Sequence, residues 1–189
     1  MAGLERHVAF LGGINVGGHR VTMGRLRDEV TRLGFADVST FIASGNVVFS
    51  ADVDGMADGM ADGMADGSAA NVIEDIIADG LAAALGWPVP TFVRSAAALA
   101  VAVDLQPFGE LADGTTHMIL FCRSEPDRAI EQLSNDHERW EVHGADVHWL
   151  IRGGVSDSVV TLAKLPRLLG QPCTSRNTKG MRRLAALLR

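Results

Sequence analysis

The chain has 189 residues, 47% of them hydrophobic, and this length suits one medium domain or two small ones with a real core. No apolar run approaches the roughly 20 residues of a membrane-spanning helix, and we expect no secretory signal at the N-terminus. The net charge is −6, but five aspartates between residues 52 and 66 supply most of it and leave −1 for the rest. The acidity therefore does not exclude an anionic ligand, least of all near residues 159–189, which hold seven basic side chains and no acidic one.

The two cysteines, Cys122 and Cys173, form no C-x-x-C pair, so neither a disulfide framework nor a zinc site is expected. We expect both thiols to be reduced and buried, because a free cysteine packs as a small hydrophobic residue. The predicted location is the cytoplasm. No motif implies a metal or a cofactor.

The first half of the chain is predicted to run strand, helix, strand, strand, helix, strand, helix. Thr22 is a suitable N-cap for a helix whose apolar positions begin at Met23 and Leu26, and Gly34 ends this helix. Ser44-Gly45-Asn46 is predicted to be the tight turn of a hairpin. The predicted elements are strands at 7–11, 38–43, 47–49 and 88–93 and helices at 22–33, 71–85 and 95–103.

A tetrapeptide in three copies, MADGMADGMADG, stands between the hairpin and the second helix, from Met56 to Gly67. Its aspartates are four residues apart, whereas a calcium loop places its carboxylates at alternating positions. A helix would bring these like charges together and hold a glycine in every turn. We predict an exposed, flexible loop without a metal-binding role, within an insertion at 51–69.

The second half repeats the order of the first. Its predicted elements are strands at 117–122, 139–143, 146–151 and 172–175 and helices at 126–133, 157–169 and 178–188. Pro166 is expected to kink or break the helix at 157–169. A two-residue turn at Gly144-Ala145 would pair Trp140 with Trp149 in the core of the second half.

The same hairpin register has a polar side. It places His143 and His148 on one face together with two carboxylates. Two histidines with two carboxylates can bind a metal, but we favour a solvated ladder of polar side chains.

The order strand, helix, strand, strand, helix, strand is the ferredoxin-like pattern. We predict an α+β protein with two such domains in tandem, each with an extra helix and an antiparallel or mixed sheet. A doubly wound parallel sheet fits less well, because both halves contain a hairpin. The predicted boundaries are 1–94 for the first domain, 95–114 for a helix and connector, and 115–189 for the second domain.

This topology predicts two clusters of polar, glycine-rich loops. The loop at 12–20 should lie beside the turn at 44–46, and residues 153–158 should lie beside 174–177. We expect both clusters to line one cleft between the domains that binds a small anionic molecule. The predicted ligand-binding residues are Gly13, Asn15, Gly17, Gly18, Ser44, Gly45, Asn46, Ser158, Arg176 and Asn177.

The sequence contains no complete catalytic constellation, so enzymatic activity stays undecided. His19 is a weak candidate for a general base, since a loop histidine is more often merely exposed. The loop also fails both phosphate-loop templates. Gly17 is followed by Gly18 and His19 instead of Lys and Ser or Thr, and the glycines come in adjacent pairs.

The opening segment, from FLGGINVGGHR to SGNVVF, resembles the signature of a bacterial family catalogued as domain of unknown function 1697. The matching stretches are Leu11 to Gly18, Met23 to Leu26, Gly34 to Thr40, Ser44 to Phe49 and the late TSRN. The resemblance covers nearly the whole chain and implies the same tandem α+β architecture, but it implies no activity.

Four positions depart from the family pattern. Gly12 stands where members usually have Arg, and Thr178 stands where TSRN is usually followed by Trp. Asp157 and Val159 stand at two positions that are usually basic. If the cleft of the family binds an anion, this chain is expected to bind it weakly or to bind something else.

Two alternative functions stay open. Ferredoxin-like sheets can bind RNA through exposed aromatic side chains, but tyrosine is absent and both hairpin tryptophans are assigned to the core. A nucleic-acid partner is therefore disfavoured. The other alternative is a protein-interaction or dimerisation module without catalysis, and the sequence does not give the oligomeric state.

Overall fold

The computed structural model describes residues 4–43, 45–52 and 66–189. Most of the MADG repeat and Ser44 therefore lie outside the described residues. The chain divides into two compact units, Met1–Ala98 and Leu99–Leu187, with Leu188 assigned to unit 1 and Arg189 to unit 2. The boundary falls inside α4 (Ala96–Asp104).

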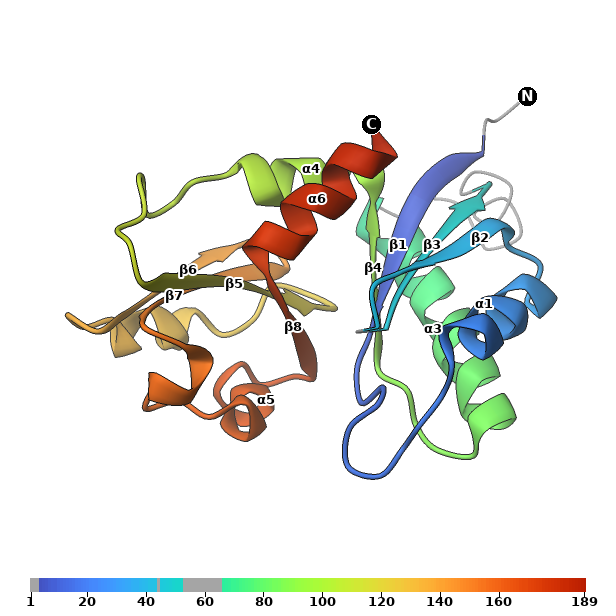
Figure 1. Cartoon of the computed structure of the whole chain (residues 1–189), viewed down its shortest axis with the longest axis horizontal. Helices are drawn as coiled ribbons and strands as arrows, with labels where there is room; N and C mark the ends of the chain where they lie inside the picture. Colours follow the sequence, from blue (N-terminus) through green and yellow to red (C-terminus); the bar gives the residue numbers. More distant parts are fainter. Residues whose placement is uncertain (1–3, 44, 53–65) are drawn as a thin grey trace. The chain divides into compact units, whose positions relative to one another are not determined.

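Unit 1 is a four-stranded antiparallel sheet with two helices on one face (Figure 1). Its elements are β1 (Glu5–Leu11), α1 (Met23–Arg32), β2 (Ala36–Phe41), β3 (Asn46–Ala51), α3 (Asp66–Leu85) and β4 (Thr91–Ser95). The strand order β2-β3-β1-β4 places the first strand beside the third and fourth, as the split ferredoxin-like pattern requires. The second helix begins five residues before its predicted start, in the last copy of the repeat.

The core of unit 1 lies between the sheet and α1 and α3. Fully buried residues of these elements include Ala9, Leu26, Val30, Ile73 and Leu81. Thr22 is the N-cap of α1 as predicted, because its hydroxyl accepts a hydrogen bond from the Arg25 amide.

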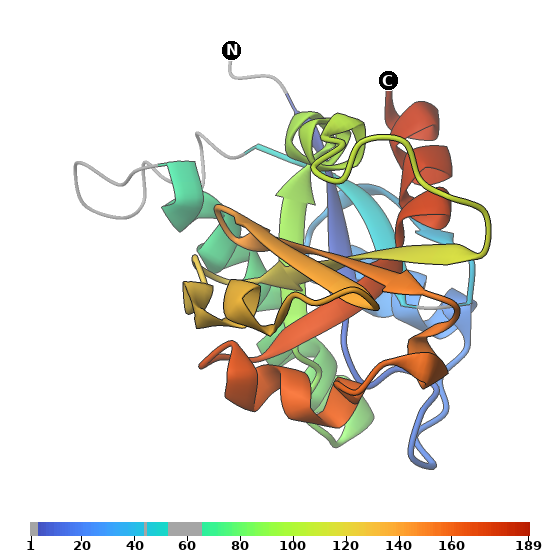
Figure 2. The same ribbon diagram turned by 90° about the vertical axis from the view of Figure 1, so that its left-hand side faces the viewer.

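Unit 2 repeats this sheet, with strand order β6-β7-β5-β8 and antiparallel pairing throughout. Its elements are β5 (Thr115–Cys122), η1 (Arg128–Leu133), β6 (Glu138–His143), β7 (Asp146–Arg152), η2 (Val155–Asp157), η3 (Leu162–Lys164), α5 (Leu165–Leu168), β8 (Cys173–Asn177) and α6 (Thr178–Leu188). In Figures 1 and 2, α4 and α6 lie on one face of the sheet, and η1 and α5 lie on the other. The predicted tandem α+β fold is confirmed, and the doubly wound parallel alternative is wrong.

Two predicted helices of unit 2 are short or broken. The predicted helix at 157–169 is two 3-10 turns followed by one turn of α-helix with Pro166 near its start. The helix at 126–133 is a 3-10 helix capped by Asp127, whose carboxylate accepts from the Ala129 amide. Proline sits well in a first turn but not in a helix interior, which explains the break in the longer segment.

The hairpin β6–β7 has the predicted register. Trp140 pairs with Trp149, and their rings stack with centroids 4.5 Å apart in the core between the sheet and η1 and α5. The opposite side of the hairpin differs from the prediction, because His148 is fully buried instead of solvated.

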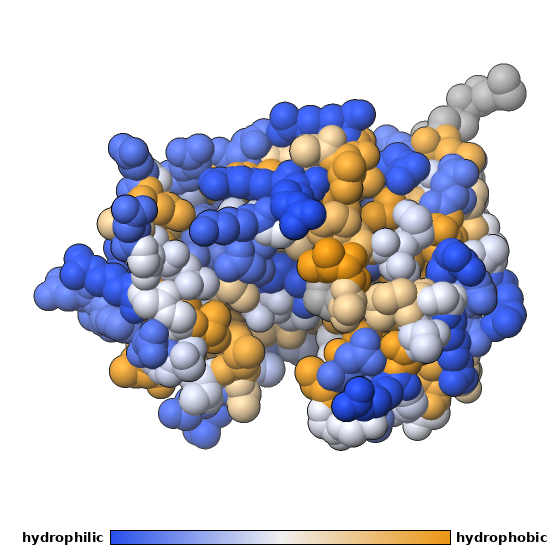
Figure 3. All heavy atoms as spheres, viewed as in Figure 1, coloured by the Kyte–Doolittle hydropathy of each residue, from blue (hydrophilic) through white to orange (hydrophobic). Residues whose placement is uncertain are grey.

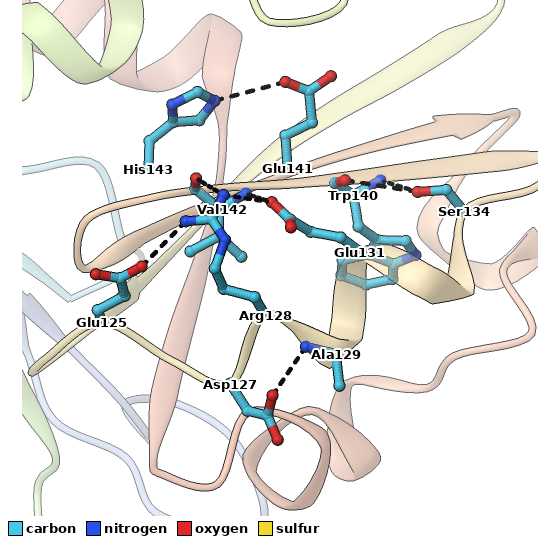
Figure 4. Close-up of polar contacts among 10 residues, drawn as sticks. All are labelled: Glu125, Asp127, Arg128, Ala129, Glu131, Ser134, Trp140, Glu141, Val142 and His143. Carbon is cyan, nitrogen blue, oxygen red and sulfur yellow. Dashed lines mark hydrogen bonds and ion pairs between the residues drawn. The ribbon is translucent and has the colours of Figure 1, made fainter.

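The outer edge of β6 is closed by side chains of η1 and the turn after it (Figure 4). Glu131 accepts a hydrogen bond from the Val142 amide at 2.8 Å, and Arg128 donates to the Val142 carbonyl at 3.2 Å. Ser134 accepts from the Trp140 amide at 2.9 Å. These bonds occupy groups that an edge strand would otherwise offer to another chain.

Within the described part of the chain, no helix combines the length and the apolar character needed to cross a bilayer.

Candidate functional site

The glycine-rich loop of unit 1, residues 12–22, is held at its start by two neighbouring segments. The Leu11 amide donates to the Gly45 carbonyl at 2.8 Å, and the Gly12 amide donates to the Pro90 carbonyl at 2.7 Å. The loop therefore leaves the sheet between the β2–β3 turn and the beginning of β4. The predicted proximity of this loop to the turn at 44–46 is confirmed for Gly45, where an added Cβ would lie 3.1 Å from the Ile14 side chain. Asn46 pairs with Phe10 of β1, and Ser44 lies outside the described residues.

Four residues of this loop have left-handed backbone conformations. Gly13, Gly17 and Gly18 have φ of 70°, 60° and 91°, and Asn15 has φ of 58°. Asparagine tolerates this region better than other side chains. The Asn15 side-chain oxygen accepts a hydrogen bond from the Val21 amide at 3.0 Å, so this residue closes the loop across six positions.

The exposed part of the loop offers backbone donors. Within the described part of the chain, the amides of Gly17 and Gly18 donate no hydrogen bond. No acidic residue occurs between positions 12 and 22, and the exposed Arg20 makes no ion pair with any described residue. Consecutive amides around left-handed residues, with a cation nearby and no anion, are a favourable setting for a negative group.

The β2–β3 turn beside the loop has strained residues of its own. Gly45 has φ of 72°, and an added Cβ would lie 3.1 Å from the Ile14 side chain, so only glycine fits this close approach. Ile42 has φ of 51° and is 51% exposed. A β-branched residue in this region is a genuine outlier, and such strain concentrates at functional positions.

Asn46, another predicted ligand residue, is turned into the protein. It is fully buried, pairs with Phe10 of β1, and donates from its side-chain amide to the Phe41 carbonyl at 3.1 Å. Its side chain therefore fixes the hairpin turn.

His19, the weak catalytic candidate, stacks on Trp87 with ring centroids 4.5 Å apart. In the described chain, no carboxylate, hydroxyl or thiol is hydrogen-bonded to its ring. The ring therefore packs on Trp87 without a side-chain partner that would orient it, and a catalytic role for His19 stays a prediction.

Ser158 lies beside the edge strand β6 of unit 2. Its hydroxyl donates to the Glu138 carboxylate at 2.6 Å and accepts from the Val160 amide at 2.9 Å. Glu138 is 1% exposed and accepts a second hydrogen bond, at 3.0 Å, from the Trp149 indole on the same oxygen. Ser158 and Trp149 therefore supply the donors to one oxygen of a buried carboxylate, Oε2, whereas Oε1 is buried without a hydrogen-bond partner in the described chain.

Arg176 and Asn177 belong to β8, the opposite edge of the same sheet. The Arg176 guanidinium donates to the Thr174 hydroxyl at 2.7 Å and to the Ser175 carbonyl at 2.9 Å, and burial lowers its pKa to about 10. Asn177 caps α6 by accepting from the Lys179 amide at 2.9 Å. The exposed cations near it, Lys179 and Arg182, lie on α6. In Figure 3 the surface around this helix combines hydrophilic and hydrophobic residues, and Leu187 of α6 is 70% exposed.

The sheet separates Ser158 from Arg176. Ser158 bonds to β6 and Arg176 belongs to β8, and these strands are three strand spacings apart, about 14 Å. The predicted second cluster is therefore not assembled as one site, because the loop after β7 folds toward β6 instead of β8.

Sequence reasoning missed a buried histidine pair in unit 2. His117 Nε2 lies 3.0 Å from His148 Nδ1, and the two residues are 6% and 0% exposed. The pairing of β5 with β7 makes them diagonal neighbours on one face, so a predicted β5–β7 register would have found them. Among the described residues, no group of three or more His, Cys, Asp or Glu side chains could hold a metal ion.

Comparisons with known proteins agree with this architecture. A family model described as a protein of unknown function, DUF1697, matches residues 4–148, and the chain belongs to that family. The conserved bacterial protein SP0830 from Streptococcus pneumoniae has a similar structure, with a TM-score of 0.68 and 20% sequence identity. The similarity covers 98% of this chain and 99% of that one, and it shows the fold alone. No curated protein matches this chain significantly.

Proposed function

We propose that this member of the DUF1697 family binds a small anionic group, such as a phosphate, on the exposed loop 12–22 of unit 1. The observation that supports the proposal is the pair of unengaged amides at Gly17 and Gly18, next to Arg20 in a segment without acidic residues. Backbone amides in left-handed turns point together and form concave sites for anions. No reaction is assigned to the loop.

The proposed site has an apolar side as well. Val16 and Ile42 are large hydrophobic residues that are 59% and 51% exposed, in the loop and in the adjoining turn. A ligand that combines a phosphate with an organic moiety could contact both kinds of surface. The proposal leaves out Ser158, Arg176 and Asn177, since their polar atoms already bond within unit 2.

A titration of ¹⁵N-labelled protein with inorganic phosphate and with adenosine monophosphate, at constant ionic strength, tests the site. We expect the amide signals of Gly17, Gly18 and Arg20 to shift together. Replacing Arg20 with alanine should weaken binding about 10- to 150-fold, because a hydrogen bond to a charged group contributes about 1.5–3 kcal/mol. The matched control is Arg27→Ala, which removes an exposed cation from α1 that is paired with Asp28 at 2.9 Å.

Two outcomes would contradict this function. If neither probe shifts the loop signals at millimolar concentration, the loop is not an anion site. If Arg27→Ala weakens binding as much as Arg20→Ala, the attraction is a general effect of charge.

The alternative that the strained Ile42 favours is a protein-interaction surface at this end of the sheet. Such a surface would bury Val16 and Ile42 without any dependence on phosphate. A concentration-dependent mass that is lost in Ile42→Ser would support self-association instead. A nucleic-acid partner stays disfavoured, since no tryptophan or phenylalanine of the described chain is more than partly exposed. Cytoplasmic location also stays a prediction.

A further inference from the structure

The histidine pair of unit 2 is joined by a direct contact between ring nitrogens. His117 Nε2 and His148 Nδ1 are 3.0 Å apart, so one ring must donate a proton that the other accepts. The second nitrogen of His148, Nε2, is buried and has no hydrogen-bond partner in the described chain. The contact is complete with both rings neutral, and a further proton on His148 would have no acceptor there.

The pair also connects several elements on the α4 and α6 face of the sheet. Phe108, in the segment before β5, packs edge-on against His117 with centroids 5.4 Å apart. Thr178, the first residue of α6, donates its hydroxyl to the His117 carbonyl at 2.9 Å. His143 of β6 meets His148 edge-on at 5.4 Å. Phe108 touches the His117 ring itself, whereas Thr178 bonds to its main chain. Loss of the ring contact would therefore loosen the 105–114 segment directly, and protonation would act on α6 through repulsion between His117 and Arg182.

The charges around the pair are mostly positive. The groups that face it are Arg139, Glu141 and His143 from β6, Asp146 from β7, Arg176 from β8 and Arg182 from α6. The Glu141 carboxylate is paired with Arg139 at 3.3 Å and with His143 at 3.6 Å. Neither Glu141 nor Asp146 is hydrogen-bonded to the ring of His117 or His148. No anion in the described chain is therefore placed to bind a proton-bearing form of the pair.

These surroundings disfavour protonation. Burial lowers the pKa of His117 to about 4, with a contribution from the charge of Arg182. Burial likewise lowers the pKa of His148 to about 3, helped by His117 and His143. Both pKa values are below the ordinary 6.5 of histidine. The contact between the two neutral rings therefore contributes its full stability above pH 6.5, and this stability is lost as the pH falls toward 4.

We propose that the His117–His148 contact is an acid-sensitive latch, which holds the 105–114 segment and α6 on the sheet while both rings are neutral and releases them on protonation. The opposite face should stay packed, because its core around Trp140 and Trp149 contains no histidine. Acidification is thus expected to open one face of unit 2 before the unit unfolds.

Hydrogen–deuterium exchange at pH 7 and pH 5, corrected for the intrinsic rate at each pH, tests the latch. Each histidine is taken to have its ordinary pKa of about 6.5 in the open state. Each ring should then raise the equilibrium constant for opening about 20- to 30-fold between pH 7 and pH 5. The rise should appear in peptides from 105–121 and 178–188, and much less in β6 and β7 peptides around the tryptophans. Substitution of both latch residues, as H117F and H148L together, should remove the pH dependence, whereas the control H19N, which replaces an exposed histidine of unit 1, should keep it.

The latch is refuted if the 105–121 and 178–188 peptides exchange no faster at pH 5, or if the double variant keeps the wild-type response. Where the double variant does not fold, an NMR titration of the histidine ring protons in the unmodified protein decides the matter. Signals of His117 and His148 that titrate near pH 6.5 would overturn the proposal, and signals still neutral below pH 5 would support it.

Discussion

Replacing Gly45 with alanine should destabilise unit 1 more than the same change at Gly17, and the difference measures how tightly the candidate loop packs on the turn. Both glycines have left-handed backbones, with φ of 72° and 60°. An added Cβ at Gly45 would lie 3.1 Å from Ile14 and 3.3 Å from Leu11, whereas one at Gly17 would meet nothing within 4 Å.

The magnitude follows from these two contributions. A side chain in the left-handed region costs about 1–2 kcal/mol at either position. Overpacking adds about 1–3 kcal/mol at Gly45 only, because Ile14 is buried and its Cβ cannot turn away from the clash. We therefore expect Gly45→Ala to lower the free energy of unfolding by about 2–5 kcal/mol and Gly17→Ala by about 1–2 kcal/mol.

Urea denaturation followed by far-ultraviolet circular dichroism measures both values, with the two units fitted as separate transitions. The transition of unit 1 should move in both variants and that of unit 2 in neither. Equal losses in the two variants would refute the reasoning, because they would show that the loop does not approach the turn as closely as the structure has it.

Other predictions concern unit 2. Ser158→Ala should lower its stability by about 1.5–3 kcal/mol in denaturation, since it removes a donor from a buried carboxylate, while the exposed control Ser156→Ala should have no measurable effect. Glu131→Ala should expose the edge of β6 and produce concentration-dependent association in sedimentation velocity. The control Glu125→Ala should not associate. A Glu131→Ala variant that stays monomeric would show that the edge of β6 does not need this cover. Burial raises the pKa of Cys173 to about 11, so its alkylation at pH 8 should be at least about a hundredfold slower than that of a free cysteine. Cys122 is buried as expected, whereas Cys173 is only half-buried, and modification at the rate of a free thiol would contradict the raised pKa.

The sequence was sufficient for the order of the elements and for the hairpin of unit 2. Alternation of apolar and polar residues around Gly144 determines which side chains share a face, and the pairing of Trp140 with Trp149 followed from that pattern alone. The adjacency of loop 12–22 to the β2–β3 turn also followed, because the strand order of a ferredoxin-like sheet brings these ends together.

Local pattern was insufficient where tertiary contacts decide the outcome. Pro166 predicts the break in the helix expected at 157–169, but not that α-helix is confined to Leu165–Leu168, with a 3-10 turn at Leu162–Lys164 before it. Ser158 is drawn to the buried Glu138, and this contact depends on β6, twenty residues earlier in the chain. No pattern within the segment itself could reveal it.

The basic C-terminal segment illustrates why residue type alone is a poor guide to an anion site. Seven cations and no acid between residues 159 and 189 are compatible with a ligand of opposite charge, but also with solvated helix faces. In the structure, Arg176 is 9% exposed and its guanidinium bonds to neighbouring groups of its own strand, while Lys179 and Arg182 lie exposed on α6. A site needs donors that converge on one point, and the cations of this segment are divided between the sheet interior and the helix surface. Loop 12–22 has only Arg20 and a few amides, yet these belong to one short segment, and for that reason it is the better place to look for the ligand.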